Sequence, residues 1–320
     1  MPVGNSDRGV GLWAGQIMFG LDNAIQYIDW WHDVLPGSNE TFDHKGSLTS
    51  LTTTPTLTFG LSNYWNLTIS KTIGKRTMGW NSDSSTIHHR DEGTDSDFLN
   101  AVGGAMGDTK LMLRYLVFND GQGPGKRWFL GSGIVIPSKN TLTSDPFFLS
   151  GEDATDHRHF SLSDGVYKQI LEIQFFKKRT LSPVFIGGTL MAEIPLLENK
   201  YGFKSSQLYD LSLTAFSKLI PKKNASLGGN IIVRHTTPSY WNGLESPNSR
   251  ATIVTLGGGT LWNLSVGGIG LTIQKPFFVG GAFSGIEGEV DQRIGAWQLS
   301  LSYRKLFDYL LPWIDPLKNL

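Results

Sequence analysis

The feature that most constrains the fold is a recurring alternation of apolar with polar or small side chains over segments of about ten residues. Between positions 110 and 118 the apolar residues occupy every second position: Leu111, Leu113, Tyr115 and Val117. Successive side chains of a β-strand point to opposite faces, so this period of two predicts strands with one apolar face. The other face carries Thr, Ser, Asn and Gln, whereas the outward face of a soluble β-sandwich usually carries Lys and Glu. The alternation therefore favours a membrane-spanning β-structure.

The connections between these segments alternate between short and long. Strands are predicted at about 11–21, 51–61, 64–74, 108–118, 126–136, 166–178, 183–192, 208–219, 225–236, 251–261, 263–274 and 295–305. The short connections are 62–63, 119–125, 179–182, 220–224 and 262, and the long ones are 22–50, 75–107, 137–165, 193–207, 237–250 and 275–294. This order predicts an all-β, antiparallel up-and-down barrel of about 12 strands with short periplasmic turns and long extracellular loops. An even number of strands places both chain ends in the periplasm.

Composition removes several classes of protein. The 28 basic and 28 acidic side chains cancel, so we expect no nucleic-acid partner, because phosphate binding needs a basic face. Cys is absent, which excludes a disulfide framework, a thiolate metal site and a cysteine nucleophile. No run of about 18 apolar residues occurs, so a closed barrel is the remaining way to span a bilayer. Residues 1–5 show no export signal, so we interpret the chain as a form from which the signal was removed.

Two segments depart from the strand pattern within a single predicted domain, 1–320. Apolar residues between Leu21 and Leu35 recur at helical spacing, which predicts an amphipathic helix over 22–36 that caps the outer mouth or plugs the lumen. Residues 306–320 are rich in apolar and aromatic side chains, and we expect them to form a periplasmic tail at the membrane interface. Aromatic residues near the predicted turns favour an interfacial girdle: Tyr64, Trp65, Trp128, Trp262 and Tyr303.

The inward face offers candidate residues for selectivity. If Leu111, Leu113 and Tyr115 face lipid, the same parity turns five charged side chains into the lumen: Lys110, Arg114, Lys168, Glu172 and Arg234. A charge that faces lipid near the midplane costs a few kcal/mol, which favours the inward position. These residues either set the sign and polarity of what passes or pair across a narrow lumen and close it.

We expect no enzyme activity and no cofactor. The sequence has no Gly-x-Ser-x-Gly nucleophile elbow, and the Ser within 281–285 lacks an evident base, so no catalytic residue is assigned. Asp153, Asp156, His157 and His159 are candidates for a divalent metal site, since His-x-His with nearby carboxylates can bind such ions. A solvated polar loop is the simpler interpretation, and carboxylates in outer loops are equally compatible with calcium that bridges lipopolysaccharide.

Two predicted strands carry a resemblance to a known family. The run from Gly107 to Tyr115, followed after a turn by the run from Gly131 to Ser138, is similar to a G-D-x-x-L-x-x-R-Y … G-x-G-x-x-x-P signature. That signature is associated with an outer-membrane family labelled as meta-pathway phenol-degradation transporters. Residues 291–303 also resemble the last strand of that family. The resemblance implies a barrel that admits aromatic or other hydrophobic compounds and has no established catalytic residues.

The resulting prediction is a monomeric channel in the outer membrane of a Gram-negative cell. Small solutes, hydrophobic or aromatic ones among them, would pass through it without energy input. The alternative from another class is a plugged barrel that serves as an anchor or scaffold for a partner protein. The expected partners are outer-membrane lipid, lipopolysaccharide and a small-molecule solute, with a protein partner under the scaffold alternative. A barrel of about twelve strands is narrower than a sixteen-strand porin, so large solutes are not expected.

Overall fold

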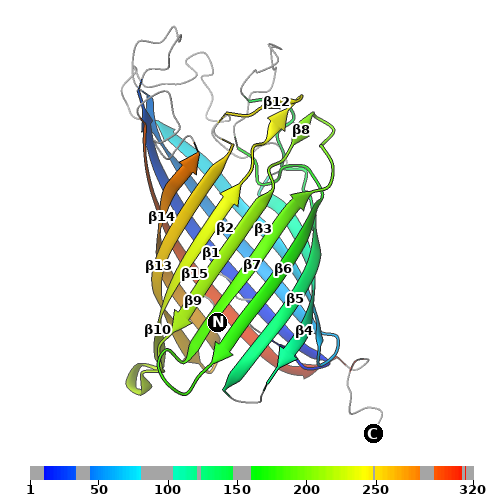
Figure 1. Ribbon diagram of the computed structural model, residues 1–320, viewed down its shortest axis with the longest axis vertical. Helices are drawn as coiled ribbons and strands as arrows, with labels where there is room; N and C mark the ends of the chain where they lie inside the picture. The colour runs from blue at the N-terminus through cyan, green and yellow to red at the C-terminus, as the bar shows by residue number, and fades with distance from the viewer. Residues whose placement is uncertain are drawn as a thin grey trace.

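A closed antiparallel barrel of twelve strands makes up the molecule (Figure 1). The computed structural model describes residues 11–33, 44–80, 104–120, 124–146, 160–247, 249–281, 292–311 and 314. The barrel strands are β1 (Gln16–His32), β2 (His44–Gly60), β3 (Trp65–Trp80), β4 (Met106–Asn119), β5 (Gly125–Ile136), β6 (Lys168–Lys178), β7 (Phe185–Pro195), β9 (Leu208–Phe216), β10 (Ala225–Thr236), β13 (Ala251–Leu264), β14 (Gly267–Gly281) and β15 (Gln292–Leu310). Each pairs with the barrel strands before and after it, and β1 pairs with β15 to close the ring. The predicted up-and-down barrel is confirmed.

Short and long connections lie at opposite ends of the barrel, as predicted (Figure 1). The short ones span 61–64, 120–124, 179–184, 217–224 and 265–266. At this end the backbone N–H of Gly15 donates to Gly60 O at 2.7 Å, and that of Leu311 donates to Gly15 O at 2.8 Å. The first and last barrel strands therefore meet beside the short turns, which in an outer-membrane barrel are periplasmic.

The outer surface of the wall is apolar. Large apolar side chains that point away from the barrel are exposed on successive strands, among them Leu57, Leu113, Leu130, Leu171, Leu190, Leu213, Ile231, Leu256, Ile273 and Leu299. A continuous apolar surface of this extent is unfavourable in water and matches the lipid-facing band of a membrane barrel. Three of the predicted girdle residues are exposed beside the short turns: Tyr64, Trp65 and Trp128. No helix among the residues that the structure describes is long and apolar enough to span a membrane.

The helix predicted over 22–36 is wrong wherever the structure describes this segment. Residues 22–32 continue strand β1, which pairs along its length with both β15 and β2. Ile25, Tyr27 and Asp29 are exposed and alternate with less exposed residues, so the side chains follow a period of two. Over this short stretch, the spacing of the apolar residues is compatible with a helix and with a strand. The two neighbouring strands supply hydrogen bonds on both edges of β1, and this pairing makes residues 22–32 a strand and not a helix.

The start of the predicted periplasmic tail, 306–320, also needs correction. Residues 306–310 belong to strand β15, which is longer than the predicted strand 295–305. Leu306 pairs with Met18 and Phe307 with Ile17, so the first residues of β1 give the end of β15 its ladder partners. Beyond the strand, the structure describes residues 311 and 314 of the predicted tail.

A second, small sheet lies at the end of the barrel that carries the long connections (Figure 1). It consists of β8 (Phe203–Lys204), β11 (Tyr240–Trp241) and β12 (Leu244–Glu245), which lie within the predicted long connections 193–207 and 237–250. The rings of Phe203 and Trp241 lie 4.8 Å apart, and Trp241 is buried. This contact ties the β7–β9 connection to the β10–β13 connection.

Candidate functional site: the barrel lumen

The inward face of the wall can be identified from the burial pattern of each strand. In β4, Met112, Arg114 and Leu116 are buried, whereas Leu113 and Tyr115 are exposed on the apolar outer surface. In β6 and β9 the even positions are again the buried ones. The lumen is therefore lined by the residues that alternate with the lipid-facing apolar row.

A buried ion pair crosses three strands of the wall. Arg114 of β4 donates from Nε to Glu172 Oε1 of β6 at 2.6 Å and from Nη1 to Thr68 Oγ1 of β3 at 3.1 Å. Gly131 of β5 lies between the two charged residues in the strand register. A Cβ atom at Gly131 would lie 3.0 Å from Glu172 Oε1, so the absence of a side chain there lets the ion pair close over β5. Gln174 adds a donor to Glu172 Oε1 at 2.8 Å.

Two further ion pairs expose the cation and bury the carboxylate. Arg234 of β10 contacts Asp210 of β9 with 2.6 Å between Nη2 and Oδ2, and Lys110 pairs with Glu193 of β7. The Lys110 and Arg234 side chains are 35% and 48% exposed, whereas those of Glu193 and Asp210 are 9% and 7% exposed. The inner wall therefore presents cationic groups in front of their counterions.

All five charged residues singled out in the sequence take part in ion pairs. Lys168 at the start of β6 pairs with Asp164, which precedes the strand. The carboxylates Asp164, Glu193 and Asp210 were not identified from the sequence, because the strand register that brings them to their partners is not visible there. Whether the five residues set selectivity or close the lumen stays a prediction.

The connection between β5 and β6 is held from inside the barrel at its outer end. Arg76 of β3 donates from Nη1 to Ser161 O at 2.8 Å, and Asp108 of β4 accepts from the Ser138 backbone N–H at 3.0 Å. Arg76 and Asp108 have the inward parity of their strands, and so does Lys168, which pairs with Asp164. The described parts of this connection, 137–146 and 160–167, therefore reach into the outer mouth, a role that the sequence had suggested for 22–36.

Asn140 joins the inserted connection to its surroundings. Its side chain is completely buried and donates to Gly104 O at 2.7 Å. It also accepts from the Leu162 backbone N–H at 2.7 Å, which joins the two described parts of the connection. Sequence reasoning missed this residue, since a single Asn in a polar loop carries no signal of burial.

Asp164 links this connection to the next one. Its Oδ2 accepts from Ser205 Oγ at 2.5 Å, and its backbone O accepts from Asn199 Nδ2 at 3.0 Å. Burial opposes ionisation of Asp164, yet the Lys168 ammonium, the Ser205 hydroxyl and the Arg76 guanidinium together hold the pKa of that carboxyl below its ordinary value. Asp164 therefore stays charged at neutral pH and holds two outer connections to the barrel.

Apolar side chains also line the interior, in two clusters. Met112, Val135 and Ile170 pack together with Met191 at the level of the charged residues. Nearer the short turns, Phe129 packs with Leu116, Phe176 and Phe185. A Cβ atom on Gly11 would lie 3.6 Å from the Phe129 ring, so the chain just before β1 reaches across the lumen at this end. The lumen is thus partly apolar and is narrowed from both ends.

The metal candidates Asp153, Asp156, His157 and His159 lie outside the described residues. Within the ranges that the structure describes, no group of three or more His, Cys, Asp or Glu could hold a metal ion.

Comparison with known proteins supports the fold. No protein-family model matches the chain, and no curated protein matches it. Among solved structures, the COG4313 outer membrane channel from Pseudomonas putida F1 has a TM-score of 0.64 and 14% sequence identity, over 94% of this chain and 99% of that chain. The translocator domain of the autotransporter NalP from Neisseria meningitidis has a TM-score of 0.41 and 10% identity, over 95% and 91% of the two chains.

A deltaS2S3 mutant of the TodX monoaromatic hydrocarbon channel has a TM-score of 0.41 and 9% identity, over 92% and 91% of the two chains. The first of these structures shares the fold of this chain, which is a closed barrel of twelve strands.

Proposed function

We propose that the chain is a passive channel of a Gram-negative outer membrane for small solutes, apolar and aromatic ones among them. The observation that carries the proposal is the composition of the inner wall, where apolar clusters alternate with charged groups that are paired. An apolar solute can pass along such a wall while the charged side chains keep their counterions. The solved channel of similar fold is named as an outer membrane channel, which supports the same function.

We also propose membership of the outer-membrane family labelled as meta-pathway phenol-degradation transporters. The support is the signature in β4 and β5. Its Arg114 forms the buried ion pair, and the first Gly of its second half, Gly131, makes room for that pair. These two residues of the signature therefore act together in the lumen, one as a member of the ion pair and the other by leaving space for it.

The first test is conductance of the purified full-length protein in a planar bilayer. We expect small, stable steps, because the segments around Gly11 and Asn140 narrow the lumen. A folded barrel that gives no steps and no uptake of small solutes into proteoliposomes would favour the scaffold alternative.

The second test asks whether the current passes the charged wall. In a KCl gradient we expect the reversal potential to favour anions, since the Lys110 and Arg234 side chains are exposed in front of buried carboxylates. The double variant Lys110→Gln/Arg234→Gln should shift the potential towards cations. Lys275→Gln is the matched control, because Lys275 lies on the outer face over the Trp297 ring. An unchanged reversal potential in the double variant would mean that the current does not pass Lys110 and Arg234.

A further inference from the structure

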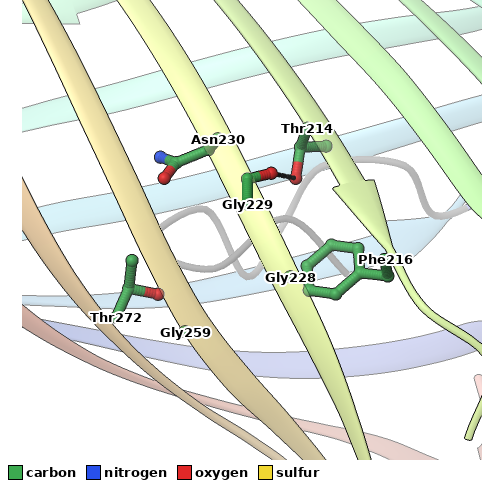
Figure 2. A pocket seen from close by; sticks show the side chains of 7 residues that line it. All are labelled: Thr214, Phe216, Gly228, Gly229, Asn230, Gly259 and Thr272. Atoms are coloured by element: carbon green, nitrogen blue, oxygen red, sulfur yellow. Dashed lines mark hydrogen bonds between the residues drawn. The ribbon is translucent and has the colours of Figure 1, made fainter. Parts of the chain in front are cut away.

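Three basic residues of the outer wall differ from those of the lumen in having no partner of opposite charge. Inside the barrel, ion pairs and hydrogen bonds join neighbouring strands, as where Thr214 Oγ1 donates to Gly229 O at 3.4 Å (Figure 2). On the outer wall, Lys45 of β2, Lys75 of β3 and Arg293 of β15 have no carboxylate partner among the described residues. They are therefore available to an anion from outside the protein.

The three cations share the lipid-facing side of their strands. Exposed apolar residues at the same parity are Leu51 on β2, Ile69 on β3 and Leu299 on β15. Trp31 of β1 lies between Arg293 and Lys45 in the strand register, and the Arg293 Cζ atom lies 5.5 Å from the centre of the Trp31 ring. Four adjacent strands, β15, β1, β2 and β3, thus carry one basic and aromatic surface on the outside of the barrel.

Aromatic residues mark the depth of this surface in the membrane. Tyr27 and Trp297 are partners in the register and are 45% and 54% exposed. Ile17 pairs with Phe59 beside the short turns. The step of about ten residues from Ile17 to Tyr27 spans roughly 25 Å along the barrel axis, at 3.3 Å per residue and a tilt of about 40°. This is the height of the apolar band, so Tyr27 and Trp297 lie at its outer boundary.

The cations lie at two levels of this boundary. Lys75 pairs with Leu51, whose partner on β1 is Ile25, so this lysine lies at the edge of the apolar band. Arg293 and Lys45 lie level with Trp31, about one turn of side chains further out. In the described parts of these four strands, the only acidic residue with the lipid-facing parity is Asp29. Basic groups therefore predominate where lipid headgroups would lie.

We propose that this surface binds a phosphorylated glycolipid of the lipid A type in the outer leaflet. Its phosphates accept hydrogen bonds from the Arg293 guanidinium and from the lysine ammonium groups. Its acyl chains lie along the apolar residues directly below, which are Ile25, Leu51 and Leu299. The inference rests on the proposed location in the outer membrane and not on the channel activity.

The arrangement favours such a glycolipid over other sources of phosphate. A free phosphate ion would gain nothing from the apolar residues below the cations. A phospholipid with a single phosphate would reach only one of the two levels, either Lys75 or the pair Arg293 and Lys45. Lipid A carries two phosphates at opposite ends of a disaccharide, so it can contact both levels at once.

The test measures lipid binding to the purified full-length protein by native mass spectrometry in non-ionic detergent. The probes are lipid A with both phosphates, the same lipid without phosphates, phosphatidylglycerol and inorganic phosphate. We expect the bisphosphorylated lipid to bind about tenfold or more tightly than its dephosphorylated form, because each basic residue near a headgroup adds attraction. Phosphatidylglycerol should bind more weakly, and inorganic phosphate should not compete with the lipid.

Variants locate the site on the wall. Lys45→Gln/Arg293→Gln should weaken binding of bisphosphorylated lipid A by about tenfold to thirtyfold, whereas the charge-retaining Lys45→Arg/Arg293→Lys should keep most of it. Lys305→Gln is the matched control, because Lys305 is exposed on the same face of β15 and pairs with Phe19 near the short turns. Heat-modifiable migration in gels shows that each variant is a folded barrel before binding is measured.

The outcomes separate this inference from the channel proposal. Equal binding of the two forms of lipid A would overturn the inference, and so would equal losses in Lys305→Gln and in Lys45→Gln/Arg293→Gln. Phosphatidylglycerol that binds as tightly as lipid A, or competition by inorganic phosphate, would overturn the choice of a glycolipid. Conductance is measured on the same preparations: conduction without a preference for phosphorylated lipid A refutes only the lipid site, whereas the preference without conduction or solute uptake refutes the channel.

Discussion

At the scale of single residues, the shape of the lumen depends on glycines as well as on the larger side chains that line it. Arg114 reaches Glu172 because Gly131 separates them, and the Phe216 ring lies over Gly228. A buried ion pair of this kind contributes little net stability by itself, since desolvation offsets the attraction. Removal of one partner, however, leaves the other charge uncompensated.

The stability of Glu172 variants tests this difference. Glu172→Met should lower the free energy of unfolding by about 3–5 kcal/mol, because Arg114 then stays buried without its partner. The double variant Arg114→Met/Glu172→Met should recover much of that loss, since both charges are gone. Urea unfolding followed by tryptophan fluorescence measures both. Equal or greater loss in the double variant would contradict the uncompensated-charge explanation.

At the scale of elements, the described parts of the connection between β5 and β6, 137–146 and 160–167, form an insert in the outer mouth. Inward side chains of β3, β4 and β6 hold it, and Asp164 joins it to the connection between β7 and β9. The contacts named here are polar, and Asp164 is the charged residue of the insert that takes part in them. The position of the insert should therefore respond to a change of charge at Asp164.

Loss of the Asp164 charge should release the insert. Asp164→Asn removes the attraction to Lys168 and Arg76, and we expect larger single-channel conductance because the outer mouth widens. Glu245→Gln, an exposed change in the small sheet, is the control and should have no effect. Unchanged conductance in Asp164→Asn would show that the insert stays in place without this charge.

The pH dependence follows from the lowered pKa of Asp164. A carboxyl whose folded-state pKa is depressed contributes stability above its unfolded pKa and loses it as the pH falls through the folded value. Conductance of the unmodified protein should therefore stay constant from neutral pH down to about 4, the ordinary value for Asp, and rise only below it. A rise already between pH 7 and 5 would point to a different titrating group.

At the scale of the whole molecule, stability depends on closure of the ring and on the lipid outside it. Closure gives every barrel strand two neighbouring strands, and β1 pairs with β15 over the length of β1. The apolar outer row then contacts acyl chains, and the polar inner row is removed from them. The same side chains would be unfavourable on a soluble protein of this size.

A charge on the outer wall tests this arrangement. Leu213 is 49% exposed and pairs with Ile231 near the middle of β10, so Leu213→Arg should destabilise the barrel in vesicles by about 2–4 kcal/mol. Leu244 is 46% exposed but lies in the small sheet outside the barrel, so Leu244→Arg should cost much less. Equal effects in vesicle-based unfolding would argue against a lipid-facing Leu213.

Much of the fold and part of the site followed from local pattern. The alternation around Leu113 predicts which face of β4 meets lipid, and the same parity identifies Lys110 and Arg114 as inward residues. The helical spacing after Leu21 misled, because a period of 3.6 and a period of 2 share several positions over a short stretch. Only the hydrogen-bonded ladders to β2 and β15 show that the segment is a strand and not a helix.

What the sequence by itself determined is the two-faced strand, the order of short and long connections and hence the closed barrel, because polarity at every second position is a local property. The tertiary structure alone decided which residues meet: Arg114 with Glu172 over Gly131, Asp164 with Ser205, and the Phe216 ring with Gly228. These partners lie on different strands or connections, and their contacts depend on the register and curvature of the closed wall. A shift by one residue would turn each side chain to the opposite face, so the site exists only once the ring has formed.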